Sequence, residues 1–208
     1  MKVTVPVLVV LIGLAPALEA RGNTRDPMIF QESYDQEAKG RDREALDVLD
    51  QLSPQKNASY VAFLRKGWLH HRLGQNVPAI AAYEKAIALA PKSIEPRLGI
   101  LLPLLAERRW SAAERQAREI LKIDPENYLA SLRLAFALYN QGKFPESRAR
   151  YQKVVERYPS DMDARCGLGF AYLKLGKARE ARAIFQIVLE FSPRNTLARQ
   201  GMTMLGHR

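Results

Sequence analysis

The sequence contains a single cysteine, Cys166, among 208 residues. One thiol cannot form an internal disulfide, so the fold must be held together by packing alone. We interpret Cys166 as a small, buried apolar residue, because a free cysteine in a folded protein usually behaves as one.

Side chains that carry out reactions are also scarce. The chain has three histidines, and His207 lies in the terminal tail. His70 and His71 are neighbours, so on a helix they would point about 100° apart and would not easily bind one metal ion together. No glycine-rich phosphate loop and no Gly-x-Ser-x-Gly turn occurs. We therefore expect no enzyme activity, no metal site and no cofactor.

No apolar run is long enough to span a bilayer easily. The run from Val3 to Leu14 has 12 residues, follows the basic Lys2 and precedes small residues that offer cleavage sites. This order is typical of a secretory signal peptide over residues 1–20. We expect an exported, periplasmic protein whose mature chain begins near Leu18 or Arg21 and has no transmembrane span. An uncleaved N-terminal anchor is the alternative.

Acidic residues are outnumbered by basic ones, 22 to 32, which gives a net charge of +10. Together with 47% hydrophobic and 26% charged residues, this composition fits a soluble folded protein. In an exported protein such a charge favours an anionic polymer, the membrane surface or an acidic protein as partner. Nucleic acid would be considered only for a cytoplasmic protein, so we expect none here. A solvated basic surface explains the same charge without any partner.

A period of 34 residues runs through most of the chain. We call the residues that share one position of the period a column. One column is always small and another is always proline: Ala79, Ala113, Ser147 and Ala181; Pro91, Pro125, Pro159 and Pro193. The period defines four units: Tyr60–Ser93, Ile94–Asn127, Tyr128–Asp161 and Met162–Asn195. Such self-similarity indicates a stack of equivalent structural units.

Each unit predicts two helices. In the third unit, apolar residues recur at helical spacing until Gly142, Pro145 sits near the first turn of the second helix, and Pro159 stops that helix. Three further columns agree with this reading: Gly74, Gly142 and Gly176, with Arg108 in the second unit; Tyr83, Tyr151 and Phe185, with Ala117; and the always apolar Ala86, Ile120, Val154 and Val188. The small column predicts a close approach of the two helices, with the aromatic side chain packed alongside.

These columns resemble the tetratricopeptide repeat (TPR). The fourth unit matches best, through Leu168, Gly169, Tyr172, Gly176, Ala181, Phe185, Val188 and Pro193. The first unit departs from the family pattern at Lys66 and His70, and the second carries Pro103 inside its first helix, where we expect a kink. The resemblance implies an all-α fold, a right-handed α-solenoid of stacked helix–turn–helix units. We expect a linker over residues 21–26, a degenerate hairpin over 27–57 and a capping helix over 196–208.

In the resembling family the first helix of each unit lines the concave face. Residues at i, i+4 and i+7 of these helices form what we call the inner stripe: Leu64, Trp68 and His71; Leu98, Leu102 and Leu105; Leu132, Phe136 and Tyr139; Cys166, Phe170 and Leu173. The same helices have a second apolar face that serves the core, so we expect the inner stripe to meet a ligand, another copy of the chain or the flanking helices. Some of its members are expected to pack between units instead.

Charged residues flank the inner stripe: Arg72, Arg133 and Lys174 beside it, Glu95 and Asp163 at its ends. An apolar floor with a basic rim suits a helix or an extended segment of a partner that bears acidic residues. Some members of the resembling family grip a C-terminal carboxylate, but of the matching positions Leu64, Trp68, Gly99, Leu129 and Arg133 only Arg133 fits, so that activity is not supported.

The sequence thus predicts a non-enzymatic interaction scaffold of the bacterial envelope, whose partner is another envelope protein. The alternatives are a binder of anionic envelope polymer, an accessory subunit of an envelope enzyme complex, and self-association.

Overall fold

The computed structural model describes residues 25–206, and within this range helices are joined by short turns, without a β-strand. The signal peptide predicted for residues 1–20 and most of the predicted linker lie outside the described residues. The helices are α1 (Arg25–Ala38), α2 (Asp42–Val48), the short 3₁₀ helix η1 (Leu49–Gln51), α3 (Pro54–Asn57), α4 (Tyr60–Arg72), α5 (Asn76–Leu89), α6 (Glu95–Ala106), α7 (Trp110–Ile123), α8 (Tyr128–Asn140), α9 (Phe144–Arg157), α10 (Met162–Lys174), α11 (Ala178–Phe191) and α12 (Thr196–Gly206).

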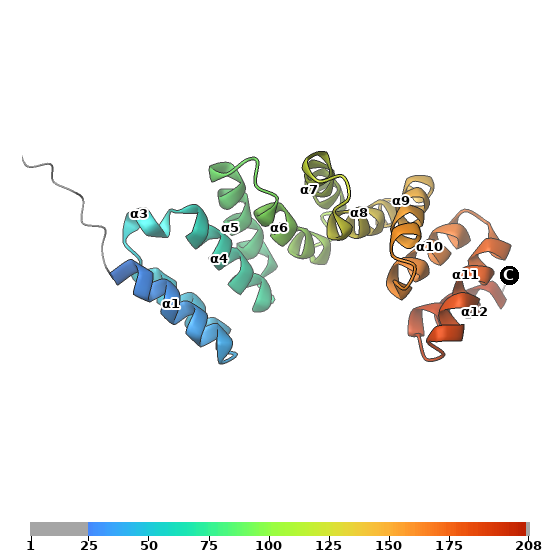
Figure 1. The fold of residues 1–208 in the computed structure, drawn as a ribbon, viewed down its shortest axis with the longest axis horizontal. Helices are drawn as coiled ribbons and strands as arrows, with labels where there is room; N and C mark the ends of the chain where they lie inside the picture. The colour runs from blue at the N-terminus through green and yellow to red at the C-terminus, as the bar shows by residue number, and fades with distance from the viewer. Residues whose placement is uncertain (1–24, 207–208) are drawn as a thin grey trace, which may run out of the picture.

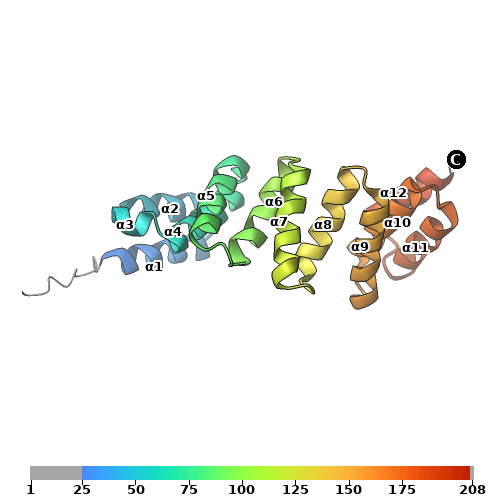
Figure 2. The same ribbon diagram turned by 90° about the horizontal axis from the view of Figure 1, so that it is seen from above.

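The helices follow one another along the long axis of the molecule, from α1 at one end to α12 at the other (Figures 1 and 2). Each packs chiefly against the helix before and the helix after it in the sequence. The first helices of neighbouring units also touch, from α4 and α6 through to α10 and α12. The predicted solenoid of helix–turn–helix units is therefore confirmed.

The turn inside each unit depends on one left-handed residue. Gly40, Gly74, Gly142 and Gly176 have φ between 70° and 77°, and Arg108 takes the same place in the second unit with φ 53°. Glycine adopts this conformation without steric cost, whereas a residue with a Cβ does not. The glycine column therefore marks the C-terminal end of each first helix, and Arg108 holds a strained backbone.

The start of most first helices is fixed by a polar side chain in another 34-residue column. Ser59, Asn127, Asp161 and Asn195 each accept a hydrogen bond from the backbone N–H three residues later, at 2.9–3.3 Å. These are N-caps, which satisfy a backbone donor that the helix itself leaves free. Local chemistry thus sets both ends of these helices before any packing is considered.

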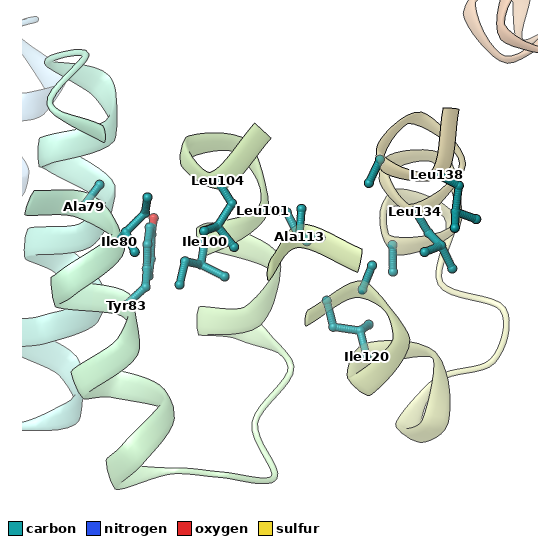
Figure 3. Packing of buried hydrophobic residues seen from close by; sticks show 13 residues of the cluster. Ala79, Ile80, Tyr83, Ile100, Leu101, Leu104, Ala113, Ile120, Leu134 and Leu138 are labelled. Atoms are coloured by element: carbon teal, nitrogen blue, oxygen red, sulfur yellow. The ribbon is translucent and has the colours of Figure 1, made fainter. Parts of the chain in front are cut away.

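The core lies between the helix layers, where the small column allows close approach. Ala79, Ala113, Ser147 and Ala181 are all fully buried, as predicted. Figure 3 shows the packing around α5, α6, α7 and α8, where Tyr83 of α5 faces Ile100 of α6. The glycine at the next first helix makes room for each ring, because a Cβ on Gly99 would lie 2.4 Å from the ring of Tyr83.

We call a ring that fits against a glycine of the next first helix an aromatic wedge, and the boundary between two consecutive units a joint. The same aromatic wedge recurs at two later joints. A Cβ on Gly167 would lie 2.4 Å from the ring of Tyr151, and one on Gly201 would lie 2.3 Å from the ring of Phe185. Aromatic rings set between backbone segments thus fix the spacing of consecutive units. The joint after the second unit lacks its ring, since Ala117 replaces the aromatic residue.

The two ends of the array are held by different contacts. Helix α1 already includes Arg25 and Asp26, ahead of the hairpin start predicted at residue 27, because Asp26 is buried and its carboxylate accepts hydrogen bonds from the backbone N–H and the hydroxyl of Ser53 at 3.0 and 2.6 Å. At the other end α12 buries Ala198 and Leu205 against the last unit. In the middle, α6 continues through Pro103 as far as Ala106.

Three further observations concern the described residues alone. Cys166 is fully buried, as predicted, and burial raises the pKa of its thiol to about 11. Between residues 25 and 206 no three His, Cys, Asp or Glu side chains gather in a way that could hold a metal ion. None of the helices in this range has the length and apolar character that crossing a membrane requires.

Candidate functional site

A hollow of about 450 Å³ opens on the first helices of the later units. We call it the central hollow, and it is lined by Leu102, Leu105, Leu129, Leu132, Arg133, Phe136, Tyr139, Tyr151, Asp163, Gly167, Phe170 and Leu197. These residues come from α6, α8, α10 and α12, with Tyr151 from α9. The stack of equivalent helices therefore builds one continuous surface out of four separate segments.

The floor of the central hollow is apolar and open to solvent. Leu102, Leu129, Phe136 and Leu197 keep 40–43% of their surface exposed. Burying such side chains within this chain would be favourable, yet the fold leaves them uncovered. A group of large exposed apolar residues on one surface is typical of a binding site.

Aromatic rings behind the floor hold its side chains in place. The ring of Phe136 meets Trp110 of α7 edge-on, with ring centroids 6.0 Å apart, and Phe170 meets the buried Phe185 in the same way at 5.1 Å. Edge-to-face pairs of this kind are favourable and orient both rings. The second helices of the repeats therefore position the side chains that the first helices present.

Arg133 of α8 is the one basic residue that lines the central hollow. Its Nη1 donates a hydrogen bond to the backbone carbonyl of Leu98 at 3.1 Å, and burial lowers the pKa of the guanidinium. Among residues 25–206 no carboxylate lies within ion-pair distance of Arg133. The exposed Asp163 lines the same hollow without reaching it.

A smaller hollow of about 290 Å³, the N-terminal hollow, is lined by Tyr34, Val61, Leu64, Arg65, Trp68, Tyr83, Glu95 and Gly99. Beside it, Glu37 accepts hydrogen bonds from Trp68 Nε1 at 2.6 Å, from Arg72 at 3.3 Å and from Arg65. Burial opposes ionisation of Glu37, but these hydrogen bonds hold its pKa below the usual value. The charges here are satisfied within the chain.

The structure divides the predicted inner stripe. Leu102, Leu105, Leu132, Phe136, Tyr139 and Phe170 line the central hollow together with Arg133, and Leu64 and Trp68 line the N-terminal hollow. His71 and Leu98 lie between them, half-buried, in neither hollow.

Two further members of the inner stripe belong to the core. Cys166 and Leu173 are buried, at 0% and 1% exposure, in one cluster with Leu205 of α12. The prediction that they face the groove is wrong, because the packing of α12 against α10 encloses them. Conversely, Leu129 and Leu197 line the central hollow but lie outside the stripe. The sequence feature that could have identified them is their shared column, since they stand 68 residues apart, twice the repeat period.

A third hollow, of about 600 Å³, lies between α3, α4 and α5. Its apolar lining is mostly small, with Pro78, Ala81 and Ala82. Both of its lysines have partners within the chain, since Lys66 pairs with Asp50 at 3.0 Å and Lys85 lies 5.2 Å from the ring centroid of Phe63. Although larger, it lacks the exposed leucine and phenylalanine side chains of the central hollow. We therefore take the central hollow as the candidate site.

Among solved structures, several share this fold. MamA residues 41 to the end from Desulfovibrio magneticus RS-1 superposes with a TM-score of 0.78 at 18% identity, covering 84% of this chain and 99% of that one. YrrB, described as a TPR protein with an unusual peptide-binding site, gives 0.76 at 15% identity over 84% of this chain and 90% of its own. A second MamA structure gives 0.74 at 18% identity over 79% and 90%.

No curated protein matches the sequence. Family models described as tetratricopeptide repeat match residues 60–93, 103–147 and 132–196. Together these segments make up more than half of the 208 residues. With the helical hairpins, the small column and the aromatic wedges in place, the chain belongs to the tetratricopeptide-repeat family.

Proposed function

We propose that this protein is a scaffold that binds a helix or an extended segment of another protein in the central hollow and carries out no chemistry itself. The observation that carries the proposal is the row of exposed Leu102, Leu129, Phe136 and Leu197, which the first helices α6, α8 and α12 present to one hollow. An apolar floor with few polar groups suits a partner's side chains. That YrrB is described as having a peptide-binding site supports the same use of this fold.

Photo-crosslinking tests this function. A benzophenone amino acid in place of Phe136 should give a defined adduct with one partner protein in the native host, whereas the same amino acid in place of Val77, which is 65% exposed on α5, should not. The adduct should disappear when Phe170 is also replaced by alanine. Equal crosslinking from both positions would contradict a site in the central hollow.

We propose further that the protein is exported and that its partner is another protein of the bacterial envelope. Support comes from the order of basic, apolar and small residues over positions 1–20. N-terminal sequencing of protein from the native host should find a mature chain that begins near Leu18 or Arg21. Intact Met1 in a cytoplasmic fraction would contradict export.

A second candidate, the binding of an anionic envelope polymer, is favoured by the uneven charge. Residues 61–206 carry 24 Lys and Arg against 13 Asp and Glu, whereas residues 25–60 carry 5 against 8. Binding of a carboxylated polysaccharide such as alginate to this basic surface should weaken steeply as salt is raised, because exposed charges are screened. Affinity that does not change with salt would exclude this mode.

A further inference from the structure

The array contains two arginines in one column, and they differ in what surrounds them. Arg65 of α4 and Arg133 of α8 are separated by 68 residues, which is two periods of the repeat. At the other joints of the array this column holds a glycine: Gly99, Gly167 and Gly201. The arginines therefore stand where the chain usually makes room for an aromatic ring.

Each arginine is accommodated because its joint lacks that ring. The aromatic column holds Leu49 in the hairpin before Arg65 and Ala117 in the unit before Arg133, and both are fully buried. Arg65 and Arg133 thus occupy equivalent positions on the same surface of the solenoid, and they can be compared directly.

Each nitrogen of the Arg65 guanidinium donates a hydrogen bond. Its Nε donates to the hydroxyl of Ser33 at 3.1 Å, its Nη2 donates to the Ser33 carbonyl at 2.8 Å, and its Nη1 donates to the carboxylate of Glu37. This arrangement is what a buried guanidinium requires, because an unpaired charge removed from water is costly.

Arg133 lacks the equivalent partners. Two periods after Ser33 and Glu37 stand Leu101 and Leu105, so the hydroxyl and the carboxylate are both replaced by apolar side chains. The single hydrogen bond to the Leu98 carbonyl uses one of five guanidinium donors. A half-buried cation therefore faces an apolar hollow without the anion that its counterpart Arg65 has.

We infer that the segment occupying the central hollow carries an Asp or Glu side chain that pairs with Arg133 and stands in for the missing counterpart of Glu37, with apolar residues beside it. This inference rests on the proposed function and specifies its partner. The hollow extends from Leu102 and Leu105 on one side of Arg133 to Phe170 and Leu197 on the other, so the bound segment passes across it. The carboxylate therefore belongs to a residue within the segment and not to a chain end.

The test uses a library of synthetic peptides with amidated C-termini. One central position of each peptide is Asp, Glu, Asn or Gln, and its neighbours are apolar. The wild-type protein should bind a selected peptide with Asp or Glu at this position about 10–100-fold more tightly than the same peptide with Asn or Gln there. This difference is expected for a charge-assisted hydrogen bond in a partly dry site. Arg133→Gln should abolish this difference, and Arg133→Lys should restore part of it. Arg182→Gln, which removes one exposed charge from α11, should change nothing.

The outcomes separate this inference from the proposed function. Peptides that bind the wild-type protein, lose affinity with Phe136→Ala and yet show no acidic preference would overturn the role of Arg133 and leave the scaffold function standing. An acidic preference that persists in Arg133→Gln would overturn it as well. If only peptides with a free C-terminal carboxylate bind, the carboxylate source is wrong. If no peptide binds in a way that depends on Phe136, both proposals fail.

Discussion

Phe136 and Phe185 belong to the same array, and replacing each with alanine distinguishes a groove residue from a core residue. Phe185 is fully buried, with its ring between Gly169 and Gly201. Removing it leaves a cavity in a packed joint, so Phe185→Ala should lower the free energy of unfolding by about 3–5 kcal/mol.

The corresponding loss at Phe136 is smaller because its ring is 43% exposed. Full burial of a phenylalanine stabilises a protein by about 1.5–3 kcal/mol, and little more than half of that applies here. The edge contact with Trp110 adds about 0.5–1 kcal/mol, which brings the expected cost of Phe136→Ala to about 1.5–2.5 kcal/mol, still below the loss expected at Phe185.

Urea unfolding followed by far-ultraviolet circular dichroism measures both variants against the parent. The slope of the transition must be compared as well as its midpoint, because stacked repeats can unfold in steps. Equal losses at the two positions would refute the assignment of Phe136 to an open surface, and the binding site proposed around it would then be part of the core.

Three other changes test the repeat itself. Ala181→Leu should destabilise the array by about 1–3 kcal/mol, because it overfills the fully buried small column; an unchanged thermal melt would place the helix contact elsewhere. Arg108→Gly should stabilise it by about 1 kcal/mol in urea unfolding by relieving the left-handed backbone at φ 53°, and a loss would show that the arginine side chain matters more. Burial opposes ionisation of Glu114, but hydrogen bonds from Lys143, Gln141 and Arg118 lower its pKa from 4.5 to about 2. Glu114→Gln should therefore cost about 1–2 kcal/mol at neutral pH, and the difference from the parent should shrink as pH falls from 4.5 towards 2; a constant difference in melts across this range would rule out the charge as the cause.

The repeat architecture was predictable because its determinants are local and recur. Gly142, Pro159 and Ser147 each act within one hairpin, so their spacing alone indicates where helices end and where they approach. The N-cap column with Asn127 and Asp161 carries the same information and went unrecognised. Since every unit repeats these signals, agreement among columns compensates for the weakness of any one of them.

The site was less predictable because it depends on what covers each helix. A stripe at i, i+4 and i+7 gives the direction of a side chain but not its neighbours, so Leu173 looked equivalent to Leu105 until α12 was in place. The significance of Arg133 depends on an absence, since Leu105 stands at the position where the carboxylate of Glu37 faces Arg65. That absence becomes apparent only beside Arg65, whose guanidinium meets both a hydroxyl and a carboxylate.

Because each helix packs chiefly against its neighbours in the sequence, folding of this chain requires few closures of long loops. Chains rich in such local contacts fold rapidly, and a new repeat can form as soon as one neighbour offers it a surface. No disulfide has to form first, since only one thiol is present. A chain that emerges with its N-terminus first would first complete the N-terminal hairpin, in which acidic residues outnumber basic ones. It would pack α12 against the last unit at the end. The ring of Phe185 would then be the last aromatic wedge to be buried.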